Sequence, residues 1–296
     1  MEKKKLDQYK GFEQGPIRPP SEASSLLIRL TRNCPWNRCS FCSVYKRGKF
    51  SLRAVENIIK DIDVLHGYIK GVKQLVKPGG YADSKVFNTL YNSFEEKDRG
   101  AFNAAMNFYA SGMKSIFLQD ANSLIMKPDD LVFVLEHIKK CFPHVDRVTS
   151  YARSHTIVRI KQDDLKRMAD AGLNRIHVGM ESGSDTVLKK INKGATKADH
   201  IKAGLKVKKA GMELSEYVMP GLGGIEYSIE HALETASALN AINPDFIRIR
   251  TLALTNGTTL AKEAEQGEFE KPSDAMMAKE LRLFIESLDG IDSYIK

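Results

Sequence analysis

The sequence lacks any long apolar run. No stretch reaches the roughly eighteen uninterrupted apolar residues that a membrane-spanning helix needs. The charged amino terminus, Met1-Glu2-Lys3-Lys4-Lys5, is not followed by the apolar segment of a secretory signal. Both absences argue against a membrane protein or an exported protein, and we expect a protein of the cytoplasm.

Cysteine is also scarce, with four residues in a chain of 296. That number is too small for a disulfide scaffold. Three of the four, Cys34, Cys39 and Cys42, nevertheless fall on one short segment, and no fourth cysteine lies near them in the sequence. Three thiolates on one loop can hold three irons of a cubane iron–sulfur cluster and leave the fourth iron open for another ligand. We therefore predict a metal centre rather than a disulfide.

Acidic residues are outnumbered, because 37 aspartates and glutamates face 45 lysines and arginines, which gives a formal charge of +8. The segment 189–209 concentrates the excess, with Asp199 as its single acid. Its lysines are Lys189, Lys190, Lys193, Lys197, Lys202, Lys206, Lys208 and Lys209. Such a segment either binds nucleic acid or phosphate or forms a solvated helix face. We favour the solvated face, because no aromatic or arginine residues interleave the lysines to stack on bases.

Short β-rich runs alternate with helical patterns along most of the chain. The β-rich runs cover 26–31, 115–118, 147–151, 175–180, 214–219 and 246–252. Patterns with apolar residues three and four apart cover 52–65, 128–141, 162–171, 185–210 and 227–239. Strands that are each followed by a helix form a parallel sheet. We therefore predict an α/β fold, a partial (β/α)6 barrel with parallel strands.

The remaining segments divide the chain. Residues 1–25 are polar and contain three prolines, so they are expected to form an irregular arm. The barrel core is expected to span 26–255, with a helical insertion at 66–112 that is either a lid or a long excursion. A helical extension is expected over 256–296. Functional residues of parallel barrels gather at the carboxyl ends of the strands, and the cysteine segment directly follows the first predicted strand.

This cysteine segment, Cys34-Pro35-Trp36-Asn37-Arg38-Cys39-Ser40-Phe41-Cys42, resembles the cluster loop of the radical S-adenosylmethionine (SAM) superfamily. The similarity is to the branch that includes the coproporphyrinogen dehydrogenases and the Elp3-, MiaB- and NifB-like proteins. The usual loop is Cys-x3-Cys-x2-Cys with an aromatic residue before the last cysteine, a place that Phe41 fills. The first gap is one residue longer here. The resemblance implies a [4Fe-4S] cluster on Cys34, Cys39 and Cys42, with Phe41 near the cofactor.

Later segments resemble the superfamily's cofactor-binding motifs. Glu181, in Val178-Gly179-Met180-Glu181-Ser182-Gly183, matches an acidic residue that contacts SAM, and Lys193 matches a basic residue that pairs with its carboxylate. Pro220 and Gly221 match a turn that lies against its adenine. The usual Gly-Gly-Glu after the second strand is missing. Asp120 and Asn122 are the candidates there for binding the amino group of SAM.

The resemblance implies an oxygen-sensitive enzyme that takes an electron from a donor such as flavodoxin or ferredoxin. It would cleave SAM reductively to a 5′-deoxyadenosyl radical, which abstracts hydrogen from an unknown substrate. The alternative is a zinc- or cluster-stabilised module that binds nucleic acid through 189–209, with His66 as a fourth ligand of the zinc.

Four further residues carry expectations. Cys141 ends an apolar helical pattern and is interpreted as a small buried hydrophobe. Trp36 either covers the cluster or fixes the loop. Arg153 and His155 follow the third strand and are expected near the same mouth of the barrel, where His155 is interpreted as a surface residue.

Overall fold

A seven-stranded parallel sheet forms the centre of the computed structural model, which describes residues 7–46, 48–75 and 84–296. The strands, in their order across the sheet, are β1 (Leu26–Arg29), β4 (Ser115–Gln119), β5 (Arg147–Ala152), β6 (Leu173–Glu181), β7 (Glu213–Val218), β8 (Phe246–Ile249) and β9 (Tyr294–Ile295). Two further strands, β2 (Thr31–Arg32) and β3 (Ser51–Leu52), form a separate antiparallel pair. The edge strands β1 and β9 have one partner each, so the sheet is open. The predicted fold class, a partial barrel of parallel strands, is confirmed.

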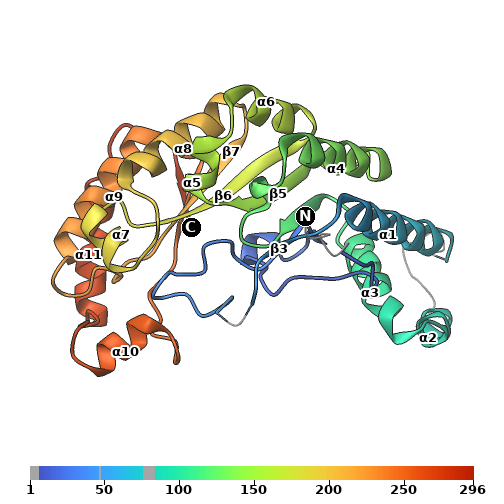
Figure 1. The fold of residues 1–296 in the computed structure, drawn as a ribbon, viewed down its shortest axis with the longest axis horizontal. Coiled ribbons are helices and arrows are strands. Elements are labelled where there is room, and N and C mark those ends of the chain that lie inside the picture. The colour runs from blue at the N-terminus through green and yellow to red at the C-terminus, as the bar shows by residue number, and fades with distance from the viewer. Residues whose placement is uncertain (1–6, 47, 76–83) are drawn as a thin grey trace, which may run out of the picture.

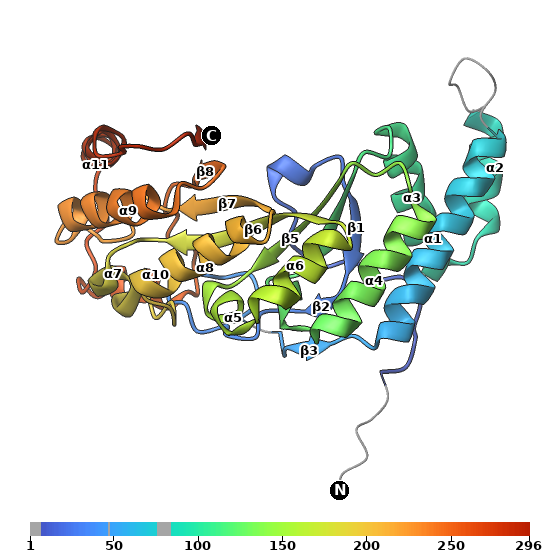
Figure 2. The ribbon, with the colours of Figure 1, turned by 90° about the horizontal axis from the view of Figure 1, so that it is seen from above.

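Helices follow the strands as the periodicity predicts. Those in the layer beside the sheet are α1 (Val55–Leu75), α3 (Glu96–Ala110), α4 (Pro128–Cys141), α6 (Gln162–Asp170), α8 (Lys197–Lys209), α9 (Ser228–Ile242) and α11 (Asp274–Glu286). The others are α2 (Ser84–Ser93), α5 (Ser154–Arg159), α7 (Asp185–Lys190), α10 (Thr259–Glu265) and the 3₁₀ turns η1 (Pro20–Glu22) and η2 (Ser123–Ile125). Figure 1 shows the layer as an arc around the strands, and Figure 2 shows α1, α4, α6 and α8 following one another along the sheet. None of the helices described here is long and apolar enough to cross a membrane.

The two faces of the sheet differ in chemistry because side chains alternate along each strand. Ile28, Leu118 and Val178 face the helices and are fully buried in the hydrophobic core. The opposite, concave face carries more polar and aromatic groups. Tyr151 and His177 lie there with ring centroids 5.5 Å apart. This face leads to the carboxyl ends of the strands, where the cysteine loop crosses (Figure 1).

Part of the predicted insertion at 66–112 packs into the fold. Helix α1 continues to Leu75, ten residues beyond its predicted end, and residues 76–83 lie outside the described part. Helix α3 places Ala105 and Phe108 in the main core. This helix therefore belongs to the layer beside the sheet, and it is not a lid.

The carboxyl-terminal segment adds a strand to the sheet, whereas the described residues of the amino-terminal arm add none. The arm of residues 7–25 is irregular except for η1, whose Glu22 is fully buried. The segment after 255 contains α10 and α11, as a helical extension would, but it also contributes strand β9. That strand has two exposed residues and therefore no alternation of burial for a sequence pattern to reveal.

Candidate functional site

A cavity of about 310 Å³ lies at the carboxyl ends of the strands. Its walls come from the cysteine loop, the ends of β5 to β8 and the segment after α7. Its lining residues include Cys34, Cys39, Phe41, Cys42, Tyr151, Arg153, Glu181, Lys193, His200, Tyr217, Met219 and Arg250. The fold thus brings together the three predicted cysteine ligands and three predicted cofactor contacts, Phe41, Glu181 and Lys193.

The three thiols do not converge on one point, as the ligands of a single metal ion would. Zinc–sulfur bonds of about 2.3 Å keep the sulfurs around one zinc within about 4 Å of one another. Among the described residues, one set of three metal-ligand atoms lies within 4.8 Å of one another, and it does not consist of Cys34, Cys39 and Cys42. A cubane cluster binds each thiolate to a different iron and therefore needs them farther apart. Three thiols that line one cavity, each able to bind a different iron, fit the ligand set of a [4Fe-4S] cluster.

The longer gap between the first two cysteines forms a tight loop. Asn33 and Asn37 adopt left-handed backbone conformations, with φ of 67° and 49°, which asparagine tolerates better than most residues. The backbone N–H of Asn37 donates to Cys34 Sγ at 3.4 Å, and its side-chain amide donates to the Tyr45 carbonyl at 2.7 Å. These two contacts of Asn37 hold the longer loop in place, and all three cysteines still line the cavity.

Trp36 joins the cysteine loop to the segment that carries Lys193. Its indole N–H donates to the Asn192 carbonyl at 2.7 Å. Gly194 packs against the ring so closely that a Cβ there would overlap it. The guanidinium of Arg153 lies 5.0 Å from the ring centroid. Trp36 is not part of the cavity wall, so the structure favours the second expected role, fixing the loop.

An ion pair between Glu181 and Lys193 lies in the cavity. Lys193 Nζ is 3.0 Å from Glu181 Oε1, and the two side chains are 12% and 13% exposed. Burial alone would lower the pKa of Lys193, but the carboxylate of Glu181 and the thiol of Cys39 raise it above its ordinary value. The ammonium group therefore stays charged. Gly179 lies beneath the pair, where a Cβ would overlap the carboxylate of Glu181.

Two arginines add positive charge to the cavity. Arg153 donates to the Lys193 carbonyl at 2.7 Å, and burial lowers the pKa of its guanidinium. Arg250, just past β8, lies 5.3 Å from the centroid of the Tyr217 ring. With Lys193, these arginines outnumber the acid Glu181. The cavity therefore suits a ligand with carboxylate or phosphate groups.

Asp120 and Asn122, the predicted substitutes for Gly-Gly-Glu, do not line the cavity. Both are fully buried. Asp120 Oδ2 accepts from Arg29 Nη2 at 2.7 Å and from the Asn33 backbone N–H at 3.0 Å. Asn122 donates to the Thr156 hydroxyl at 2.8 Å and accepts from the backbone N–H of Arg153 at 3.2 Å.

These partners already occupy the polar groups of both side chains. Asp120 and Asn122 thus hold the protein together, and Ala121 alone of this segment reaches the cavity.

Pro220 and Gly221, the predicted adenine turn, also lie away from the cavity. The N–H of Gly221 donates to Glu280 Oε1 of α11 at 2.7 Å. Pro220 borders a separate small space beside the same helix. The neighbouring Met219 lines the cavity instead. The resemblance places this turn against the adenine of SAM, but the N–H of Gly221 is bonded to α11 instead.

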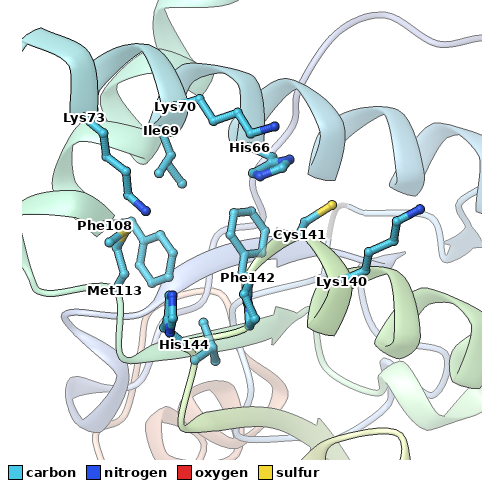
Figure 3. A pocket seen from close by; sticks show the side chains of 12 residues that line it. His66, Ile69, Lys70, Lys73, Phe108, Met113, Lys140, Cys141, Phe142 and His144 are labelled. Carbon is cyan, nitrogen blue, oxygen red and sulfur yellow. The ribbon is translucent and has the colours of Figure 1, made fainter.

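Other residues from the sequence analysis are also placed. His66 lies beside Phe142 in a separate cavity of about 250 Å³ (Figure 3), so it is not a fourth ligand for the cysteine loop. Arg153 reaches the cavity and His155 does not. Cys141 is half-buried and lies 3.6 Å from His137, so it is not only a buried hydrophobe.

The lysine-rich segment forms α7, α8 and their connection. Lys190 and Lys197 lie 3.5 and 2.7 Å from acidic side chains, and Lys206 and Lys208 donate to backbone carbonyls. Lys193 is in the cavity. Much of the segment's charge is therefore tied to the protein rather than presented as a free strip.

Sequence reasoning missed several cavity residues, among them Tyr151, Tyr217, His200 and Arg250. Tyr151 and Arg250 have a readable signal, because they lie at the carboxyl ends of predicted strands. His200 lies within α8, where its burial depends on tertiary packing. Burial, and then the charge of Lys193, lower the pKa of His200 to about 3.

Known proteins share this fold and parts of this sequence. A tRNA-2-methylthio-N(6)-dimethylallyladenosine synthase from Christiangramia forsetii is 24% identical over 257 residues, which are 84% of this chain and 47% of that protein. A tRNA uridine(34) acetyltransferase from Methanocaldococcus infernus is 27% identical over 128 residues, 43% of this chain and 24% of that protein. This chain thus spans less than half the length of either relative.

Solved structures agree in fold. The Escherichia coli coproporphyrinogen III oxidase, a radical SAM enzyme, has a TM-score of 0.54 at 14% identity, over 88% of this chain and 51% of that one. A methylornithine synthase has a TM-score of 0.53 at 15% identity, over 92% and 63%.

The sequence profile of the Radical SAM superfamily matches residues 28–236, more than half of the chain. This match confirms the predicted family, whose members use a [4Fe-4S] cluster and SAM. The chain belongs to the radical SAM superfamily.

Proposed function

We propose that Cys34, Cys39 and Cys42 bind the cluster and that SAM occupies the adjoining cavity, where Phe41, Glu181 and Lys193 contact it. One observation carries the proposal: these six residues come from three separate segments and line the same cavity. Residues 26–255 would form the catalytic core, with the arm at 1–25, the insertion at 66–112 and the extension at 256–296 as additions to it.

The cofactors would supply the electron transfer that cleaves SAM to a 5′-deoxyadenosyl radical able to abstract hydrogen. The protein would position the reactants and exclude water. Lys193 Nζ would bind the carboxylate of SAM, and Glu181 would accept hydrogen bonds from its hydroxyl groups. Phe41 and Met219 present apolar groups that keep water from the reacting atoms. We also propose a cytoplasmic enzyme that oxygen inactivates and that receives electrons from a flavodoxin or a ferredoxin.

Anaerobic reconstitution tests the cluster. The wild-type protein should bind about four irons and four sulfides per chain and release 5′-deoxyadenosine when it is reduced with SAM. Cys34→Ala, Cys39→Ala and Cys42→Ala should each lose the cluster. Cys141→Ala is the matched control, because Cys141 lies in α4 and does not line the cavity, and it should keep all four irons. A colourless protein after reconstitution would refute the proposal.

Lys193→Ala tests the SAM site separately. The variant removes one charge-assisted contact, which is worth about 1.5–3 kcal/mol, so SAM should bind at least about tenfold more weakly. The iron content should not change. Equilibrium dialysis of labelled SAM against the reconstituted protein measures the loss, and equal affinity would remove Lys193 from the site.

A more specific candidate function is modification of RNA, with a nucleotide of tRNA as the substrate. The names of both relatives specify tRNA, and Arg153 and Arg250 give the cavity an excess of positive charge that fits a phosphate group. Unmodified bulk tRNA should then increase 5′-deoxyadenosine formation by the reduced enzyme. The comparison is a nucleic-acid-free metabolite fraction, and stimulation by that fraction alone would contradict a tRNA substrate.

A further inference from the structure

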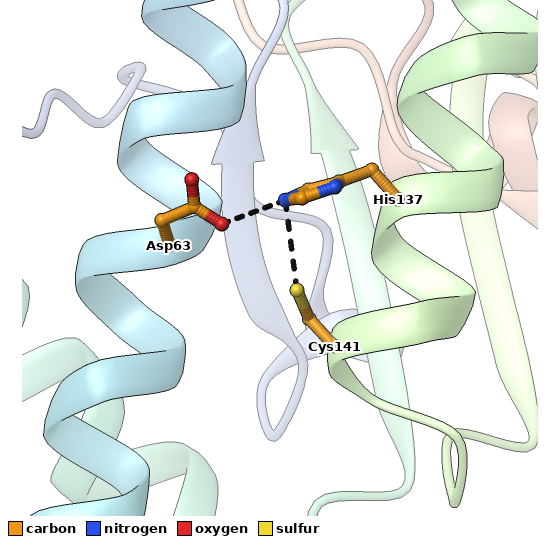
Figure 4. Close-up of side chains that lie close together, drawn as sticks. All are labelled: Asp63, His137 and Cys141. Carbon is orange, nitrogen blue, oxygen red and sulfur yellow. Dashed lines mark hydrogen bonds and ion pairs between the residues drawn. The ribbon is translucent and has the colours of Figure 1, made fainter.

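Three metal-ligating side chains converge outside the cavity described above. Asp63 of α1 and His137 and Cys141 of α4 meet where these helices pack together (Figure 4). His137 Nε2 lies 2.7 Å from Asp63 Oδ1 and 3.6 Å from Cys141 Sγ. All three ligand atoms lie within 4.8 Å of one another. None of these residues lines the cavity that holds the cysteine loop.

Two potential metal ligands approach one nitrogen of His137. The carboxylate of Asp63 and the thiol of Cys141 both lie beside Nε2, which offers either one N–H or one lone pair. If Nε2–H donates to Asp63, the thiol contributes at most a weak contact. A cation between the three atoms would use all three contacts, because each of them then donates a lone pair to it.

The separation of His137 from Cys141 suits zinc. Bonds of about 2.3 Å to sulfur and about 2.0 Å to nitrogen place the two ligand atoms roughly 3.5 Å apart in a tetrahedron, and the separation of Cys141 Sγ from His137 Nε2 is 3.6 Å. Asp63 Oδ1 lies closer to His137 Nε2 than two ligands of a tetrahedral zinc lie to each other. Its side chain is 56% exposed and free to move outward by the required amount.

We propose that Asp63, His137 and Cys141 bind a divalent cation of the zinc class, independently of the radical SAM site. His137 and Cys141 are four residues apart on one helix face, a spacing that presents both to the same ion. The ionised carboxylate and thiolate would balance the two charges of the ion. Three lysines line the adjoining cavity, which Cys141 also borders (Figure 3). Because these lysines already add positive charge, the charge of the ion must be neutralised by its own ligands. The bound ion would link α1 to α4.

Zinc K-edge X-ray absorption on the reconstituted holoenzyme tests the proposal, because it detects zinc in the presence of iron. After incubation with zinc and desalting, the protein should retain one zinc per chain. Its first shell should contain one sulfur at about 2.3 Å and otherwise nitrogen and oxygen at about 2.0 Å. No retained zinc, or a shell of three sulfurs, would overturn the proposal, since three sulfurs indicate the cysteine loop.

Variants locate the ion. Cys141→Ser should remove the sulfur from the zinc's first coordination shell. Changing a residue that only hydrogen-bonds to a ligand costs about 10–100-fold in metal affinity, and His137→Gln should cost more than that. Asp63→Asn, at an exposed position, gives a second measurement should His137→Gln misfold. His144→Ala is the matched control, an exposed histidine just beyond α4, and should keep wild-type affinity. Equal zinc affinity in Asp63→Asn, His137→Gln and wild type would refute the site.

Discussion

Glu181 has a backbone conformation that is unusual for its residue type. It ends β6 with φ of 68°, in the left-handed region, where a β-bulge shifts the pairing with β7. Residues other than glycine adopt this region at a cost and often do so at functional sites. The bulge turns the carboxylate of Glu181 toward Lys193. The backbone therefore supports the functional role that its sequence motif indicates.

Gly179→Ala tests how the ion pair is positioned. The new methyl group would occupy the place of the Glu181 carboxylate and approach Lys193 Nζ at 3.1 Å, so the carboxylate must shift from its present position. We expect SAM to bind about tenfold more weakly, while the iron content stays unchanged. Gly67→Ala is the control, because nothing lies within 4 Å of the added group in α1. Unchanged SAM affinity in Gly179→Ala would show that binding does not depend on the position of the pair.

The sequence predicts some site residues better than others, for physical reasons. The cysteines and Glu181 lie in local motifs at or just after strand ends, and Lys193 lies in a local motif just after α7. Asp120 also lies at a strand end, but its partners include Arg29 and Tyr45, far away in the sequence. Which polar groups are used inside the protein depends on such distant contacts. A local pattern does not contain that information.

The strand β7 carries a buried acid on the face opposite to the cavity. Glu216 is fully buried, and its carboxylate oxygens have no hydrogen-bond partner among the described residues. It lies next to Val178 in the sheet, and alternation places it on the helix side, away from Tyr217. Burial raises the pKa of Glu216 well above its ordinary value. Its carboxyl group is therefore protonated in the folded protein at pH values where it ionises in the unfolded chain.

Glu216→Gln should remove a pH-dependent cost. The raised folded pKa means that wild-type stability decreases as the pH rises above the unfolded value of 4.5. Each pH unit costs about 1.4 kcal/mol up to the folded pKa. Glutamine cannot ionise, so the variant's free energy of unfolding should exceed that of wild type by an amount that grows with pH. Urea unfolding at several pH values measures this difference, and a constant difference would contradict it.

Element prediction succeeds where periodicity is strong. Helix α4 lies at the predicted residues 128–141, and every predicted strand run contains a strand. The missed elements have weak local signals. Strand β9 consists of Tyr294 and Ile295, which join the sheet through pairing with β8 rather than through a pattern of their own.

Buried histidines give the whole molecule a second pH dependence. His200 contacts the Ser154 hydroxyl at 2.6 Å, and His231 contacts the Met219 carbonyl at 3.0 Å. Burial lowers the pKa of these imidazoles to about 3 and about 4, from an unfolded value of 6.5. Both are neutral in the folded protein. Below pH 6.5 the unfolded chain binds these two protons and the folded protein does not, so stability falls as the pH falls.

Glu216 and the two histidines therefore change stability in opposite directions. Above the unfolded pKa of 4.5, Glu216 keeps a proton in the folded protein that the unfolded chain releases, so its contribution to stability falls as the pH rises. Below pH 6.5 the contribution of the histidines falls as the pH falls, by up to about 1.4 kcal/mol per unit for each group. Burial also lowers the pKa of His177, which steepens the acid limb of the stability curve.

Variants separate the two contributions. Anaerobic urea unfolding of the reconstituted protein from about pH 5.5 to about pH 8 should show a smaller loss of stability toward high pH in Glu216→Gln than in wild type. His200→Gln should flatten the acid limb, because one proton fewer is then taken up on unfolding. His144→Gln, at an exposed position, serves as the control and should reproduce the wild-type curve. An acid limb of equal slope in His200→Gln and wild type would show that His200 is not the group that couples folding to acid.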